Sequence, residues 1–215
     1  MSAVLLQTGV TGLFITLLWR GPFAWVFALA IVGGLAAFFS QVVWMLRRPR
    51  SRPPNLRPPD PAVLHAAASF VWLAVASLLG VWLTVAAPST STLRVAMAYG
   101  VFGLVGFLAQ MVVGMEGRLL PIFASYWAYA NTGYKGPVPP QHEMAWRNGQ
   151  ELGFVLWLFG VPALAGGLAF DAIPFVSAGA WSLLAASLVD TVNVIRILRY
   201  AFREAERNLS ALSRV

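Results

Sequence analysis

Two ionisable residues, Asp190 and His65, lie inside apolar segments where charged or polar side chains are uncommon. Asp190 interrupts a run that is otherwise uncharged after Asp171, and Asn193 follows it on the same side of a helix. Because a carboxylate inside a membrane is costly, its presence predicts a functional group. The alternative is a structural role, in which Asp190 pairs with Arg118 or with an arginine at the end of its own helix.

The sequence contains two histidines and no cysteine, so thiolate metal sites are ruled out and any imidazole ligand must come from His65 or His142. His65 lies one turn into an apolar segment, on a face with Ser69 and Trp72. It is a candidate ligand or, alternatively, a hydrogen-bonded structural group. His142 lies in the polar stretch "PPQHEMAWRNGQE", a pattern too common to identify a metal site by itself.

Small residues and one glutamine form a stripe in the region 93–117. At about 100° per residue, one helix face contains Gly100, Gly103, Gly106, Gln110, Gly114 and Gly117. Such a face predicts close packing against another helix or, alternatively, contact with a flat cofactor such as a porphyrin or a quinone. Gln110 interrupts the glycines, and its amide needs a hydrogen-bond partner in lipid.

An acid and a base flank a glycine in the stretch "GMEGRLLP", where this apolar region ends. On a helical wheel, Glu116 points well away from the glycine stripe, whereas Arg118 lies at its edge. Arg118 is therefore the better candidate for a site, and Glu116 for the membrane interface.

The composition places these residues in a membrane protein. Of the 215 residues, 59% are hydrophobic and 11% are charged, and the mean hydropathy is +0.71. A soluble domain carries about 25% charged residues, so this chain cannot cover itself with a water-facing surface. The net charge of +7 comes mainly from arginines in the loops, so it does not indicate binding to nucleic acid.

The apolar segments predict an all-α, polytopic bundle of about six transmembrane helices in a single domain over residues 1–200. The expected spans are 3–19, 22–46, 61–87, 93–115, 152–170 and 172–195. Asp60 and Pro61 suit the cap and the first position of the third helix. The loop 116–150 is expected to be interfacial or re-entrant, or to cover a partner. The basic tail 196–215 is expected to form an amphipathic helix on anionic inner-leaflet lipids.

The arginines and lysines predict the orientation of these spans. The 47–57 loop has five, the 116–150 loop three and the tail five, against only Arg20 and Arg94 on the other side. By the positive-inside rule, both termini are cytoplasmic, as expected for a protein of a bacterial-type inner membrane.

Two stretches, "PPDPAVLHAAASFVWLAVASLLGVWL" (58–83) and "VAMAYGVFGLVGFLAQMVVGMEGRLLP" (95–121), resemble the polytopic haem-associated NnrS family. They are more distantly similar to subunit I of the haem–copper oxidases. The matching features are a histidine that opens a helix, here His65, and a small–Met–x–x–Arg turn, here "GMEGR" (114–118). The resemblance implies a membrane protein that binds haem or copper and is connected with respiration or nitric-oxide stress.

The chain departs from that family in two respects. It has about half the expected number of helices, and two histidines cannot build a haem together with a copper centre. A single haem b is compatible with His65 and either His142 or a methionine among Met111, Met115 and Met144.

Three functions follow from these observations. The first is an accessory or haem-associated subunit of a respiratory-type system that is not catalytic by itself; its cofactor face would comprise His65, Gly103, Gly106, Gln110, Gly114 and Arg118. The second is a small transporter or channel that uses Asp190, Gln110 and Arg118. The third is a purely structural subunit. In each case the expected partners are other membrane subunits or further copies of the chain. No phosphate loop or hydrolase signature is present in the sequence.

Overall fold

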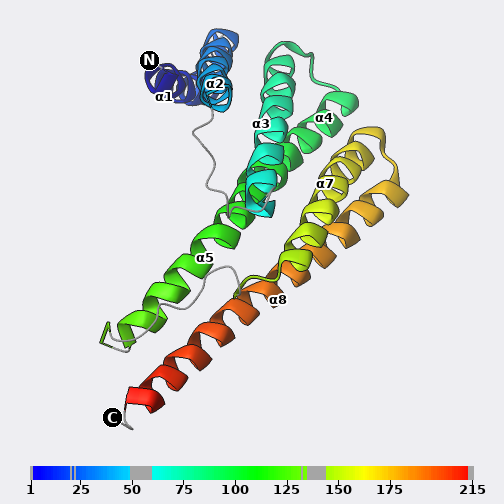
Figure 1. The fold of residues 1–215 in the computed structure, drawn as a ribbon. Helices are drawn as coiled ribbons and strands as arrows, with labels where there is room; N and C mark the ends of the chain where they lie inside the picture. The colour runs from blue at the N-terminus through cyan, green and yellow to red at the C-terminus, as the bar shows by residue number, and fades with distance from the viewer. Residues whose placement is uncertain are drawn as a thin grey trace.

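The computed structural model is helical throughout its secondary structure, which confirms the predicted all-α class, and it describes residues 2–19, 21, 23–48, 60–131, 133–134 and 144–212. The helices are α1 (Ser2–Leu18), α2 (Ala24–Leu46), α3 (Pro61–Val85), α4 (Thr90–Gly100), η1 (Val101–Ala109), α5 (Gln110–Asn131), α7 (Arg147–Phe170) and α8 (Ile173–Leu212). The segments α4, η1 and α5 form one continuous helix (Figure 1).

Five helices in the described residues are long and apolar enough to cross a membrane. They are Ala24–Met45, Pro61–Val85, Thr90–Asn131, Arg147–Phe170 and Ile173–Arg203. The chain is therefore a multi-pass membrane protein. The first helix, α1, is apolar but has 17 residues, fewer than the roughly 20 of a typical span.

Side-chain caps fix where two of the helices begin. Asp60 accepts a hydrogen bond from the backbone N–H of Ala62 at 3.0 Å, and Pro61 takes the first helical position, as predicted. Ser89 caps α4 in the same way through the N–H of Thr92 at 3.1 Å. Because these contacts are local, the sequence identifies them.

The predicted loop 116–150 is wrong in its first part, because α5 continues through it as far as Asn131. Pro121 lies inside this helix, although proline removes one backbone hydrogen bond at a cost of about 3 kcal/mol. Packing of the following residues offsets this cost. Ala124 and Ala128 form a buried cluster with Met144, Ile197 and Ala201, which we call the arm cluster.

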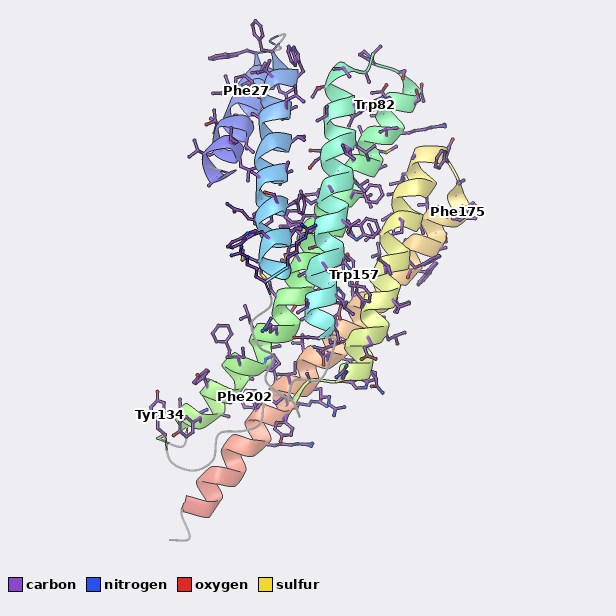
Figure 2. The ribbon with its side chains drawn as sticks, turned by 45° about the horizontal axis from the view of Figure 1, so that its top comes forward. Phe27, Trp82, Tyr134, Trp157, Phe175 and Phe202 are labelled. Carbon is purple, nitrogen blue, oxygen red and sulfur yellow. The ribbon has the colours of Figure 1, made fainter. Side chains whose placement is uncertain are left out.

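The arm cluster holds together the parts of α5 and α8 that extend beyond the other helices (Figure 1). With 40 residues, α8 is about 60 Å long, roughly twice the thickness of a bilayer core. The predicted tail helix is thus the continuation of α8 to Leu212 rather than a separate element. Figure 2 shows Phe202 on this extension, and its ring lies 4.6 Å from that of Trp127.

Neighbouring helices approach one another most closely at glycines. In the α7–α8 pair, a Cβ atom on Gly160 would lie 2.8 Å from the Leu183 side chain, and one on Gly179 would lie 2.5 Å from the backbone of Leu164. A side chain at either position would push the two helices apart. The helix α1 packs on α2, and α2 packs in turn on α3, where Phe70 meets two phenylalanine rings of α2.

Candidate functional site

Four helix segments border a small cavity near the start of α3 and α7, at the opposite end of α7 from Asp171. Its lining residues are Ala62 and His65 of α3; Val113, Glu116, Gly117 and Leu120 of α5; Gln150 of α7; and Asp190, Asn193, Val194 and Ile197 of α8. The volume open to the centre of a water molecule is about 20 Å³, which suffices for about one water. We call this space the His65 cavity, and this end of the bundle the His65 end.

His65 is held tightly between three helices. Its side chain is 3% exposed, and its ring meets that of Phe154 edge to face, with the centroids 5.3 Å apart. A Cβ atom on Gly114 would lie 2.9 Å from the Cβ of His65, so this glycine allows α5 to approach α3. The Nδ1 atom of His65 has no hydrogen-bond partner among the described residues.

Asp190 projects from α8 toward α7. The indole N–H of Trp157 donates a hydrogen bond to Oδ2 of Asp190 at 3.3 Å, and Figure 2 shows Trp157 in the middle of the bundle. A Cβ atom on Gly153 would lie 3.0 Å from Oδ1 of Asp190, so the absence of a side chain there gives room to the carboxylate. In the described part of the chain, Asp190 makes no ion pair.

Glu116 is the second carboxylate of the site, close enough to Asp190 for the two charges to interact. The sequence predicted an interfacial role for Glu116 and a site role for Arg118. In the structure, Glu116 and Arg118 are both exposed, but Glu116 lines the His65 cavity and Arg118 does not.

Both carboxylates also line a wider groove between α5 and α8. Its other lining residues are Val113, Ser187, Thr191, Val194 and Ile195, and its volume is about 310 Å³. Glu116 and Asp190 line both spaces, so they lie where the small cavity and the wider groove meet.

Two amide side chains attach the start of α7 to its neighbours. Oδ1 of Asn193 accepts a hydrogen bond from the backbone N–H of Trp146 at 2.8 Å. Nε2 of Gln150 donates one to the carbonyl of Gly117 at 3.4 Å. The sequence identified Asn193 but missed Gln150 and Trp157. An indole N–H inside an apolar segment is a signal that could have pointed to a buried acceptor such as Asp190.

Gln110 forms a separate polar contact elsewhere in the bundle. Its side chain is fully buried, and its Oε1 accepts a hydrogen bond from the indole of Trp72 at 2.8 Å. The Nε2 of Gln110 has no partner among the described residues. Gln110 does not line the His65 cavity, so the structure does not bring it together with Asp190.

The predicted glycine stripe divides at η1. This segment has π-helical i→i+5 hydrogen bonding and turns by less than 100° per residue, so positions before and after it lose their common face. Gly106 and Gly114 pack on α3, where added Cβ atoms would lie 2.9 Å from Trp72 and His65. Gly100 and Gly103 have no other group within 4 Å of an added Cβ atom.

In this arrangement, another helix packs against part of the predicted cofactor face. The space beside Gly106 and Gly114 is filled by α3, and the His65 cavity accommodates about one water molecule. Among the described residues, no three histidine, aspartate or glutamate side chains converge as metal ligands. His142, the other predicted ligand, lies outside the described residues.

Comparison of the chain with protein-family models, curated proteins and solved structures gives no match. The resemblance to the NnrS family therefore stays a prediction, and the argument for function rests on the His65 cavity.

Proposed function

We propose that this protein is a small membrane transporter or channel that binds a monovalent cation, a proton included, at Asp190. The observation that carries this proposal is the position of Asp190. Its partly buried carboxylate lies where the small cavity meets the wider groove, with no ion pair in the described part of the chain. An intramembrane carboxylate without a fixed counter-charge is suited to a mobile cation.

The surroundings of Asp190 favour a cation over other solutes. Glu116 adds a second negative charge, and the Val113 and Val194 side chains supply apolar walls that strengthen its field. The indole of Trp157 supplies only one hydrogen bond to Asp190 and no charge. An anion would therefore be repelled from this site.

The exposed arginines support an orientation in which the His65 end faces the cytoplasm. Arg118 and Arg196 directly follow cavity segments, and Arg199 and Arg203 continue along α8. Arg94 lies at the other end of the bundle, beside Asp171. By the positive-inside rule, the site would open toward the inner leaflet of a bacterial-type membrane, and the arginines of α8 would lie near its anionic lipids.

Flux measurements with purified full-length protein in sealed proteoliposomes test this function. We would follow H⁺, Na⁺ and K⁺ separately and compare the wild type with Asp190→Asn. We expect one of these fluxes to exceed that of empty liposomes and to fall by about 100-fold in Asp190→Asn, because the amide cannot supply the negative charge.

The matched control is Asp171→Asn, which makes the same change outside the cavity, at the opposite end of the bundle, and should leave the flux unchanged. Absence of any flux above empty liposomes, or a flux that Asp190→Asn leaves intact, would refute the proposal.

A second candidate is the accessory subunit of a redox complex, favoured by the unpartnered Nδ1 of His65, which is free to act as a ligand. Visible spectra of the gently solubilised protein, oxidised and then reduced with dithionite, test this function. A Soret band that shifts on reduction and is lost in His65→Ala would support it. A featureless spectrum after expression with added haem would exclude the function as a haem-binding redox subunit.

A further inference from the structure

We infer that the cation of this site is a proton, and that a water molecule held in the His65 cavity passes it between Asp190 and Nδ1 of His65. This inference rests on the proposed function and specifies the ligand of the same site. It uses the cavity, the unpartnered histidine nitrogen and the positions of the two carboxylates.

The cavity has the size of a water site, and polar side chains form part of its mainly apolar lining. Its volume of about 20 Å³ accommodates about one water, and a buried water needs two to four polar partners. His65, Glu116 and Asp190 all line the space. Since buried polar atoms are nearly always hydrogen-bonded, a water at this position supplies the partner that Nδ1 of His65 lacks among the described residues.

The remaining oxygen atoms argue against a bound metal cation. Oδ1 of Asn193 already accepts the N–H of Trp146, and the carbonyl of Gly117 accepts the side chain of Gln150. A metal ion without its hydration shell would need several oxygen ligands at once. Within the described ranges, no three acidic or histidine side chains are arranged to hold one.

The proton transfer balances in charge and atoms. The protonated carboxyl of Asp190 gives its proton to the water, and the water gives one of its own protons to Nδ1 of His65. The products are an Asp190 carboxylate and a His65 imidazolium, and the reverse step restores the starting state.

The groups that surround the water allow this exchange. Glu116 of α5 lines the same space. The residue of α7 that lines the cavity is the neutral Gln150. Its backbone forms a hydrogen bond with the His65 ring. Among the described residues that line the cavity, His65, Glu116 and Asp190 are the titratable ones.

The experiment compares proton and sodium fluxes of the full-length protein in proteoliposomes. We expect proton flux without sodium flux in the wild type, and a proton flux about 100-fold lower in His65→Gln, because glutamine is polar but does not carry the proton. The matched control is Ser69→Ala. Ser69 is buried one turn further along the same face of α3 and does not line the cavity.

A second variant tests the water itself, and it tests the relay even if His65→Gln does not fold. Ala62→Val adds two methyl groups to the cavity wall and leaves every polar group in place. We expect it to lower the proton flux as well, because it fills the space of the water. Folding of each variant is checked by size-exclusion chromatography and thermal unfolding.

The outcomes separate this inference from the function on which it rests. An Asp190-dependent sodium or potassium flux would overturn the inference and leave the proposed function standing. A proton flux that depends on Asp190 but is unchanged in His65→Gln and Ala62→Val would overturn the relay alone. Absence of any Asp190-dependent flux would overturn both.

Discussion

The two ends of the bundle differ in how their carboxylates are arranged. At the end formed by the α3–α4 and α7–α8 turns, Arg94 and Asp171 form an ion pair with an N–O distance of 2.5 Å. At the His65 end, the described residues contain two carboxylates without an ion pair and a histidine nitrogen without a hydrogen bond. The His65 end also contains an exposed ion pair, Arg147–Glu151 at the start of α7, so the contrast concerns the carboxylates at the cavity alone.

Burial explains why each arrangement is stable. The side chains of Arg94 and Asp171 are 38% and 65% exposed, so water screens their attraction, and the pair contributes about 1 kcal/mol or less. The polar groups of the His65 end are instead kept in place by close packing at Gly114 and Gly153. The comparison teaches that an unpaired polar group inside a membrane depends on the rigidity of its surroundings.

Substituting Gly114 is expected to have the largest effect on stability. In Gly114→Ala, the new Cβ would lie 2.9 Å from the Cβ of His65 and 3.0 Å from the carbonyl oxygen of Ala62, so α3 and α5 must separate. We expect the free energy of unfolding to fall by about 1–3 kcal/mol, measured by thermal or denaturant unfolding in detergent.

The same substitution at Gly103 is the matched control, because nothing lies within 4 Å of an added Cβ atom there. Gly103→Ala should leave stability unchanged or raise it by about 0.5 kcal/mol. Equal stability of the two variants would contradict the close contact between α3 and α5.

Removing the amide of Asn193 is expected to have an intermediate effect, again at the His65 end. In Asn193→Ala, the backbone N–H of Trp146 loses its acceptor, and an unsatisfied buried donor costs about 1–3 kcal/mol. Asn193→Asp keeps the acceptor oxygen, so its free energy of unfolding should fall by less. Thr191→Ala changes an exposed neighbour and should lower the free energy of unfolding only slightly. Hydrogen exchange at the start of α7 would report the loss directly.

Breaking the ion pair at the opposite end is expected to have the smallest effect. Arg94→Ala and Asp171→Asn should each lower the free energy of unfolding by about 1 kcal/mol or less, and the double variant by no more than either alone. The effect should shrink with added salt. A loss of several kcal/mol would show that this end, too, depends on its charges, and would remove the contrast between the ends.

The sequence predicted the elements whose determinants are local. The apolar segments identified the long helices, and Asp60 with Pro61 identified the start of α3. The prediction of a loop after residue 115 was wrong because the packing around Pro121 depends on Met144 and Ile197, which are distant in sequence.

The candidate site was predicted only in part. His65, Asp190 and Asn193 stood out because they are polar residues in apolar segments, and the structure places all three at the cavity. Gln150 was missed because the span was predicted to begin at residue 152, whereas α7 begins at Arg147. The predicted stripe failed at η1 because the i→i+5 hydrogen bonding changed the angular spacing on which it was based.

The order in which the helices contact one another has a consequence for how the protein is made. The helices α1 and α2, and likewise α7 and α8, are neighbours in sequence as well as in space, so each pair can assemble soon after synthesis. The His65 cavity is different, because it requires α3, α5, α7 and α8 together. During translation the α1–α2 pair can therefore form early, whereas the residues that line the His65 cavity meet only after α8, the last helix, has been made.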